Sequence, residues 1–395
     1  MFFLITNTSS IRGINVKDMK VLFLAHEAIY SGAPMALLSV IKVLKESIGG
    51  IQTDILVLNG GPMINEFSKY GKAVVCNTKE PRWHKLMRML RLRRDWNPDY
   101  LGQMGCRDYD FVYANSIATL REALYLKKKY GFPVLVHFHE SEYCVKARHI
   151  RQDMVDNCDW FVAVSELCKR NLVENFNVPE DKIVLQHPFS PWIKEVLSGR
   201  YVANKVQIEG LAEDVFVVGL SGTTDWVKGD DLVPVIVANF FRHHPEAKCK
   251  FLAIGLFDDA VDRMTFALKK EGLSDKVIML KRVPRPLDYF SKFNVLVVPS
   301  REESFSLVVE ETSVLKKPSI VFEGAIGISE LLDDSSSIQV PYLDVEAMSN
   351  AIYKLYLDRN LGKSIGESAC QRIQSLYNED SKNQAIVDLF RKIGN

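Results

Sequence analysis

Residues 295–311 read VLVVPSREESFSLVVEE, and this stretch decides the fold. The first four residues are all apolar, as expected of a strand that is buried on both faces of a sheet. Pro299 and a run of polar residues end the strand, and a helix is expected to follow and to continue to Lys316. A buried strand that leads through a polar loop into a helix is the repeating unit of α/β proteins with parallel sheets.

The same alternation of apolar runs with helix-length stretches recurs along nearly the whole chain. One series of strands is expected at residues 20–25, 54–58, 73–76, 111–114, 134–138 and 160–164, and a second at 215–220, 250–254, 277–280, 295–298 and 319–322. Between the two series, residues 188–213 contain prolines and glycines and show no strong periodicity, which is typical of a linker.

The sequence therefore predicts an α/β protein with two Rossmann-like domains that face each other across a cleft. We assign residues 1–19 to an N-terminal tail, 20–190 to the first domain, 191–213 to the linker, 214–379 to the second domain and 380–395 to a C-terminal helix. Packing back across the cleft is one placement for that helix. Ligands of open parallel sheets bind at the carboxyl ends of the strands, so the residues just after each strand are the first candidates for a site.

Composition narrows the class of protein. The chain has 395 residues, enough for two domains, and its formal net charge of +1 gives no overall field for binding nucleic acid. Seven cysteines without a CxxC pair or metal-like spacing are typical of reduced thiols in a cytosolic protein. No apolar run reaches the ~18 residues of a membrane span. Met19 precedes the first strand, so residues 1–18 are either an upstream start or a loose tail.

The first strand leads into Ser31-Gly32-Ala33-Pro34, which opens a helix. Small residues let a ligand approach the backbone, and the N-terminus of a helix favours an anion. An ordinary helix cap is the alternative.

Polar residues follow two other strands of the first series. For the histidines of His137-Phe138-His139-Glu140, a metal site, a structural role and a polar group aimed into the cleft are the three interpretations. The last is favoured for His139, with Glu140 to orient it, because the segment ends a strand. Asn115 and Ser116 also end a strand and are acceptor-side candidates, with a helix cap as the alternative for Ser116.

One pair of carboxylates, Asp108 and Asp110, is excluded as a metal site. Asp108 and Asp110 have the DxD spacing that can hold Mg²⁺ or Mn²⁺ against a diphosphate. They precede a strand and so lie at the wrong edge of the sheet.

In the second series, Gly222 and Thr223 begin a loop that ends in Lys228-Gly229, a combination suited to a diphosphate. The segment from Ser304 through Phe305 and Ser306 to Leu307 forms a helix N-terminus that can bind phosphate. Glu303 and Glu311 can accept hydrogen bonds from hydroxyls. The alternative is that Glu302 and Glu303 complement the helix dipole and that Glu311 is exposed.

The stretch from Pro299 to Glu311 resembles the Glu-x7-Glu signature of the retaining glycosyltransferases of family 4, which have the GT-B fold. Three further segments agree in the expected order. Ser31-Gly32-Ala33 resembles the glycine loop of that family, His137 to Glu140 its cleft histidine segment, and Val164-Ser165-Glu166 a strand-to-helix step late in its first domain.

The resemblance implies a role for each of several residues. Glu303 would hold hydroxyls of the donor sugar, Glu311 would hold the ribose, and Lys228 would neutralise the diphosphate. His139 would touch the transferred sugar, and the backbone around Arg282 and Val283 would meet the base. No metal or cofactor is expected.

One departure from the family pattern is Thr223, because the family often carries an arginine at that position. The diphosphate then has one cation in place of two, unless Arg301 or Arg282 compensates.

The expected activity is that of a hexosyltransferase that moves a sugar from a UDP or GDP sugar to a glycan or lipid-linked acceptor, in surface polysaccharide or lipopolysaccharide synthesis. The alternatives are a non-catalytic partner subunit of the same fold, a sugar-nucleotide epimerase and a phosphorylase. Residues 82–96 are basic and amphipathic, which suits either a membrane-bound helix or a surface helix packed on the sheet. The expected location is the cytoplasm, with peripheral contact to the inner membrane as one option.

Overall fold

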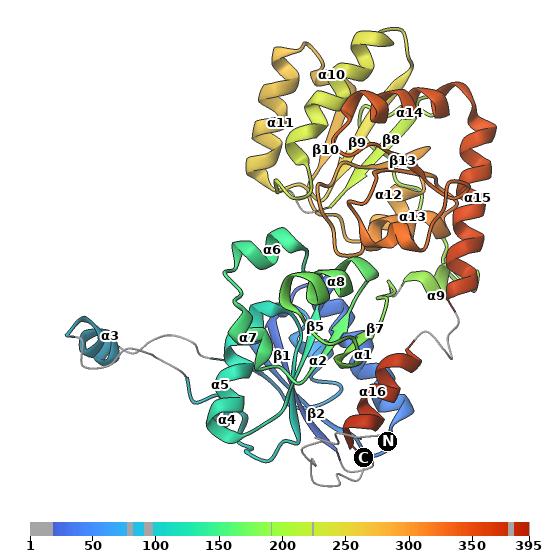
Figure 1. Ribbon diagram of the computed structural model, residues 1–395. Coiled ribbons are helices and arrows are strands. Elements are labelled where there is room, and N and C mark those ends of the chain that lie inside the picture. Colours follow the sequence, from blue (N-terminus) through green and yellow to red (C-terminus); the bar gives the residue numbers. More distant parts are fainter. Residues whose placement is uncertain are drawn as a thin grey trace, which may run out of the picture.

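The computed structural model describes residues 19–76, 82–90, 98–190, 192–222, 225–377 and 383–394. Thr223 and residues 1–18 of the N-terminal tail expected at residues 1–19 lie outside this part. The described chain forms two α/β domains, one above the other in Figure 1, with the carboxyl ends of the strands of both sheets turned toward the space between them. The expectation of two Rossmann-like domains is confirmed.

The first sheet has seven parallel strands within the described chain, in the order β3-β2-β1-β4-β5-β6-β7. Its strands are β1 (Lys20–Glu27), β2 (Gln52–Asn59), β3 (Ala73–Val75), β4 (Phe111–Ala114), β5 (Val134–Phe138), β6 (Trp160–Ala163) and β7 (Ile183–Leu185). Every residue of the central strands β4 and β5 is buried, because helices cover both faces of the sheet.

The second sheet has six parallel strands in the described chain, in the order β10-β9-β8-β11-β12-β13. Its strands are β8 (Phe216–Ser221), β9 (Cys249–Ile254), β10 (Val277–Leu280), β11 (Val295–Val298), β12 (Ser319–Phe322) and β13 (Ile338–Val340). Both sheets change winding direction beside their first strand, which is where open α/β sheets bind ligands.

The α-helices are α1 (Gly32–Ser47), α2 (Ile64–Phe67), α3 (Arg82–Met89), α4 (Tyr100–Met104), α5 (Leu120–Tyr130), α6 (Glu142–Ala147), α7 (Gln152–Asp156), α8 (Glu166–Arg170), α9 (Trp192–Leu197), α10 (Val233–His243), α11 (Asp258–Lys270), α12 (Pro286–Phe290), α13 (Leu307–Val314), α14 (Val345–Leu357), α15 (Arg359–Leu376) and α16 (Gln384–Gly394). Short 3₁₀ turns lie at Ile117–Thr119, Glu180–Lys182, Asp230–Leu232, Ser274–Lys276 and Gly327–Glu330, and a π-helical turn lies at Asn171–Asn175. No helix of the described residues is long and apolar enough to span a membrane.

The C-terminal helix α16 returns from the second domain to the first (Figure 1) and packs on α1 and β7. Its buried face joins the core of the first sheet. The Phe390 ring lies 5.2 Å from the ring of Phe111 and 6.1 Å from that of Tyr113, measured between centroids. Helix α16 therefore contributes part of the hydrophobic core of the first domain.

We expect Phe390→Ala to lower the free energy of unfolding by about 3–5 kcal/mol, because Phe390 is fully buried and the substitution leaves a cavity under the first sheet. Urea denaturation followed by circular dichroism measures the change. Phe266→Ala is the matched control, since Phe266 is 66% exposed and its loss should change stability by less than about 0.5 kcal/mol. Equal effects of the two variants would show that α16 does not support the first domain.

Candidate active site

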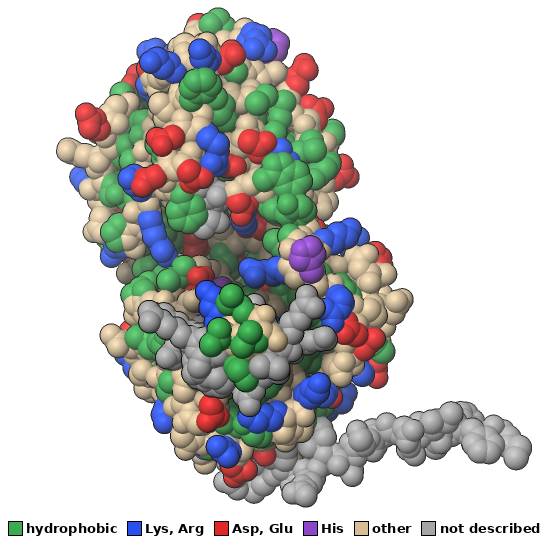
Figure 2. Space-filling model, turned by 90° about the vertical axis from the view of Figure 1, so that its left-hand side faces the viewer, with side chains coloured by type: hydrophobic (Ala, Val, Ile, Leu, Met, Phe, Trp, Pro, Cys, Tyr) green, Lys and Arg blue, Asp and Glu red, His purple; other side chains and the backbone are tan. Residues whose placement is uncertain are grey.

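A cavity of about 450 Å³ lies between the two domains at the carboxyl ends of both sheets. Figure 2 shows a hollow between the two domains, with charged side chains along its rim. From the first domain the lining includes His26, Gly32, Ala33, Ser116, His139, Glu140 and Arg148, and from the second Gly222, Lys228, Asp230, Ser300, Glu303, Ser304, Phe305, Ser306 and Leu307. The cavity thus gathers most of the residues expected from the ends of the strands.

An ion pair between Lys228 and Glu303 lies in the second domain's wall of the cavity, with Nζ 2.6 Å from Oε1. The Glu303 backbone is fixed on both sides, because its N–H donates to the carbonyl of Ala325 at 2.8 Å and its carbonyl accepts from the N–H of Gly327 at 2.9 Å. Ser300 Oγ donates to the other carboxylate oxygen at 3.3 Å. The Glu303 carboxylate is therefore held at the entrance to α13, with its cation beside it.

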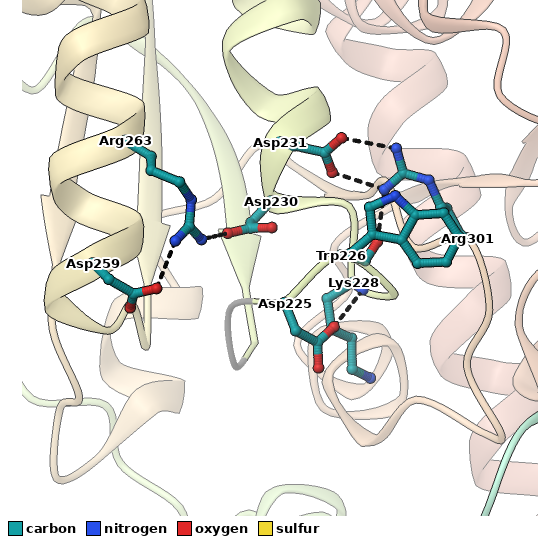
Figure 3. Close-up of polar contacts among 8 residues, drawn as sticks. All are labelled: Asp225, Trp226, Lys228, Asp230, Asp231, Asp259, Arg263 and Arg301. Atoms are coloured by element: carbon teal, nitrogen blue, oxygen red, sulfur yellow. Dashed lines mark hydrogen bonds and ion pairs between the residues drawn. The ribbon is translucent and has the colours of Figure 1, made fainter. Parts of the chain in front are cut away.

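The loop that carries Lys228 is shaped by Gly229, which has a φ of 72°. A Cβ at this position would lie 2.0 Å from the carbonyl oxygen of Pro299, so only glycine allows the loop to pack against the end of β11. The Lys228 N–H donates to Asp225 Oδ1 at 2.8 Å, which closes the turn (Figure 3). The position of the ammonium group therefore depends on a backbone that tolerates little change.

Arg301 supports this loop from outside the cavity. Its guanidinium donates to both carboxylate oxygens of Asp231, at 2.7 and 2.8 Å, and lies 4.5 Å from the ring centroid of Trp226. In Figure 3 the guanidinium points toward Asp231 and the ammonium group of Lys228 points the other way. The sequence-based suggestion that Arg301 compensates for Thr223 at the diphosphate does not fit this orientation.

In the first domain, Asn115 connects the start of α1 with the loop after β5. Asn115 Nδ2 donates to the carbonyl of Ala33 at 2.9 Å, so its side-chain oxygen is left to accept from His139 Nε2 at 3.3 Å. This arrangement selects the His139 tautomer that carries hydrogen on Nε2 and leaves Nδ1 as an acceptor. Asn115 does not itself line the cavity, but it holds the side chain of His139, which does.

Burial, together with a smaller contribution from the nearby His26, lowers the pKa of His139 to about 3. The imidazole is therefore uncharged at neutral pH and acts as a hydrogen-bonding group. His137 lies deeper, where its Nδ1 is 2.6 Å from the hydroxyl of Tyr113, in agreement with a structural role. Among the described residues no group of three or more His, Cys, Asp or Glu side chains could hold a metal ion.

Glu140 is anchored by donors on three sides. It accepts from Ser116 Oγ, from the N–H of Ile117 at 3.2 Å and from the N–H of His139 at 2.9 Å. Burial nevertheless raises the pKa of the Glu140 carboxyl to about 7. Ser116 also caps the following turn, accepting from the N–H of Ala118 at 2.9 Å, and it lines the cavity as well.

Two helices begin at the cavity. Ser31 Oγ donates to Glu27 at 3.1 Å and does not cap α1, and the Cβ position of Gly32 has no atom within 4 Å. The start of α1 therefore has no side-chain cap and leaves space beside Gly32 in the cavity wall. The N-cap of α13 is Ser306, whose φ of 98° is unusual for a residue with a side chain.

Three predicted donor-side residues do not line the cavity in the described structure. Glu311 is buried rather than exposed and accepts from Ser190 Oγ at 2.5 Å. Arg282 donates to the carbonyl of Tyr30 in the other domain, and Val283 follows it after β10. The role of Thr223 cannot be followed, because this residue lies outside the described ranges.

Sequence reasoning missed Arg148 and Asp230, which line the cavity. Arg148 follows α6 and not a strand, and Asp230 lies in a turn rich in acidic residues. His26 directly follows the apolar run at residues 20–25, and that place at the end of a strand was the signal for it.

Two carboxylates of the second domain cap helices of the first. The two Glu302 oxygens accept from the N–H groups of Glu142 and Tyr143 at 2.8 and 2.9 Å, at the start of α6. Glu330 accepts from the N–H of Glu166 at 2.8 Å, at the start of α8, and pairs with His187 Nε2 at 2.6 Å. These contacts hold the domains together on both sides of the cavity.

Comparison with known proteins agrees with this geometry. A family model described as Glycosyltransferase Family 4 matches residues 32–189, and one described as Glycosyl transferases group 1 matches residues 214–358. The two matches follow one another and together cover most of the chain. The chain belongs to the glycosyltransferases.

Curated relatives of this glycosyltransferase chain are distant. The capsular polysaccharide biosynthesis glycosyltransferase CapM of Staphylococcus aureus is 25% identical over 226 residues, which are 55% of this chain and 57% of CapM. A D-inositol 3-phosphate glycosyltransferase of Corynebacterium kroppenstedtii is 27% identical over 256 residues, which are 62% of this chain and 55% of that protein. The chain thus spans just over half the length of these relatives.

Among solved structures, Anabaena HepE in complex with UDP and glucose superposes with a TM-score of 0.72. The match covers 95% of this chain and 100% of HepE at 16% sequence identity. This likeness confirms the GT-B fold that the Glu-x7-Glu stretch suggested.

We expect the glycosyltransferase variant Glu311→Gln to be more stable than the wild type at pH 8 by up to about 3 kcal/mol and to differ little at pH 4. Burial raises the pKa of the Glu311 carboxyl to about 7 from an ordinary 4.5. The folded protein thus holds this proton more tightly than the unfolded chain, so the stability it contributes is present below pH 4.5 and lost as the pH rises to 7. Urea denaturation across this pH range measures the difference.

Glu367→Gln is the control for this prediction, because Glu367 is exposed. A difference between Glu311→Gln and the wild type that stays constant from pH 4 to pH 8 would contradict the assigned protonation.

Proposed function

We propose that this protein is a retaining hexosyltransferase that moves a sugar from a UDP or GDP sugar to a hydroxyl of a glycan or lipid-linked acceptor. The Lys228–Glu303 ion pair at the start of α13, inside the cavity between the two domains, carries this proposal. The UDP and glucose bound by HepE and the role named for CapM support a UDP sugar and surface polysaccharide or lipopolysaccharide synthesis.

The charges of the cavity suit the breaking of a bond between a sugar and a diphosphate. Negative charge grows on the departing diphosphate, where the Lys228 ammonium and the N–H groups that begin α13 stabilise it. Positive charge grows on the sugar, beside the Glu303 carboxylate. His139, uncharged at neutral pH, accepts a hydrogen bond from a sugar hydroxyl through Nδ1 without adding charge.

No side chain is assigned as the general base in this proposal. The departing phosphate takes the proton of the acceptor hydroxyl on the same face of the sugar, which retains the anomeric configuration. We propose that the transfer needs no metal or cofactor, so addition of EDTA leaves the rate unchanged.

A non-catalytic partner subunit of the same fold is the second candidate, because Thr223 stands where the family often has arginine. Release of nucleoside diphosphate from UDP, GDP and ADP sugars separates the two candidates. Turnover by the wild type supports the transferase, and binding without turnover supports the partner subunit.

We expect Glu303→Ala to lose sugar transfer and Lys228→Ala to lower kcat by about 10²- to 10³-fold, since each removes one half of the charge arrangement. Initial rates of nucleoside diphosphate release measure both effects. Glu367→Ala and Lys354→Ala are matched controls, because both residues are exposed outside the cavity. Full activity of a folded Glu303→Ala protein would refute the proposed function.

The position and exposure of helix α3 support binding of the protein to a membrane surface. The helix stands away from the body of the first domain (Figure 1). Leu86 of α3 is 56% exposed, and Leu90, which directly follows the helix and donates its N–H to the carbonyl of Leu86, is 58% exposed. The alternative of a helix packed on the sheet does not fit these exposures. We propose that α3 and its basic neighbours bind the anionic cytoplasmic surface of the inner membrane, while the basic residues from 91 to 94 lie outside the described part.

We expect the protein to sediment with vesicles that contain phosphatidylglycerol and not with vesicles of phosphatidylcholine alone. Replacing Leu86 and Leu90 together by serine should weaken this binding by about tenfold or more, because the apolar face no longer enters the bilayer. Leu357→Ser, at a residue that is 66% exposed on α14, is the control. Equal sedimentation with both kinds of vesicle would remove the membrane from the proposal.

A further inference from the structure

The cavity contains carboxylates that already have partners. Asp230 pairs with Arg263 at 2.7 Å, and Arg263 in turn holds Asp259, as Figure 3 shows. Glu303 pairs with Lys228, and Glu140 accepts three hydrogen bonds. The one lysine of the described cavity lining thus has its charge largely balanced by Glu303.

The arginines near the second domain's wall are occupied elsewhere. Arg301 is bound by Asp231 and Trp226, Arg263 by two aspartates, and Arg282 by the carbonyl of Tyr30. None of these three lines the cavity in the described structure. Within the described residues, the second domain thus contributes no arginine to the lining of the cavity.

Arg148 lies in the opposite wall, directly after α6. It lines the cavity together with His26 and Glu140, and within the described part of the chain its guanidinium has no hydrogen bond or ion pair. Its charge acts inside the cavity. Burial lowers the pKa of His26 and the Arg148 charge lowers it further, and the same charge opposes the rise that burial causes in the pKa of Glu140.

Arg148 lies close along the chain to a contact between the domains. Glu302 of the second domain holds the first two N–H groups of α6, and Arg148 follows the last residue of that six-residue helix. The same short helix thus carries a contact to the second domain at its start and a cavity-lining arginine at its end.

We propose that Arg148 binds a phosphate group in the cavity, across from Lys228. A guanidinium presents paired N–H donors that match two phosphate oxygens, which a lysine cannot do. The phosphate belongs either to the diphosphate of the donor or to an anionic acceptor. The inference rests on the proposed function, because it assumes that the cavity holds a sugar nucleotide.

Titration calorimetry with the nucleoside diphosphate that the wild type binds most tightly among UDP, GDP and ADP tests the donor as the source. If the phosphate is that of the donor, Arg148→Gln raises Kd by about tenfold or more and leaves the Kd of the free nucleoside unchanged. Arg148→Lys restores part of the loss, because it keeps the charge without the paired donors. Arg121→Gln, at an exposed arginine of α5 outside the cavity, is the matched control.

Inorganic phosphate, titrated into protein saturated with the nucleoside diphosphate, tests the acceptor as the source. If the phosphate is that of the acceptor, Arg148→Gln keeps nucleotide binding and loses phosphate binding by about tenfold or more. Thermal unfolding of each variant confirms that it is folded, which the exposed position of Arg148 favours.

Unchanged binding of both nucleotide and phosphate in Arg148→Gln overturns the inference and leaves the proposed function standing. Failure of the wild type to bind any nucleoside diphosphate overturns the proposed function, and the inference falls with it.

Discussion

The carboxyl ends of two parallel sheets face the same space, and the rest of the structure depends on this constraint. Parallel strands need a crossover after each strand, so all loops that follow the strands gather at one edge of each sheet. Here β1 and β5 place His26 and His139 at one wall of the cavity, and β8 and β11 place Gly222 and Glu303 at the other. Neither sheet alone forms the site.

Short ion pairs balance the charges of Lys228 and Asp230 in the cavity wall. An anion that draws the Lys228 ammonium toward itself would release the Glu303 carboxylate, since the two groups are 2.6 Å apart. Binding of a phosphate and exposure of a hydrogen-bond acceptor for hydroxyls would then be one event. The pairing offsets part of the free energy that it costs to take both charged groups out of water until a ligand enters.

Much of the fold could be predicted from the sequence, because buried parallel strands leave short apolar runs. The two strands that were missed, β7 and β13, are three residues long and lie at sheet edges, where burial is partial and the pattern weak. Candidate residues were found where they follow a strand, as His139 and Glu303 do. Arg148 could not be found, because an arginine after a short helix looks like any surface residue until the domains meet.

The domain contacts made by Glu302 and Glu330 use main-chain N–H groups as their partners. Every amino acid except proline offers the same N–H group, so the residues at the starts of α6 and α8 can change during evolution while the contact persists. Paired substitutions, which reveal side-chain contacts in alignments, would not mark these main-chain contacts and would reveal only the pair of Glu330 with His187. The glutamates would be retained while the residues that supply the N–H groups diverge.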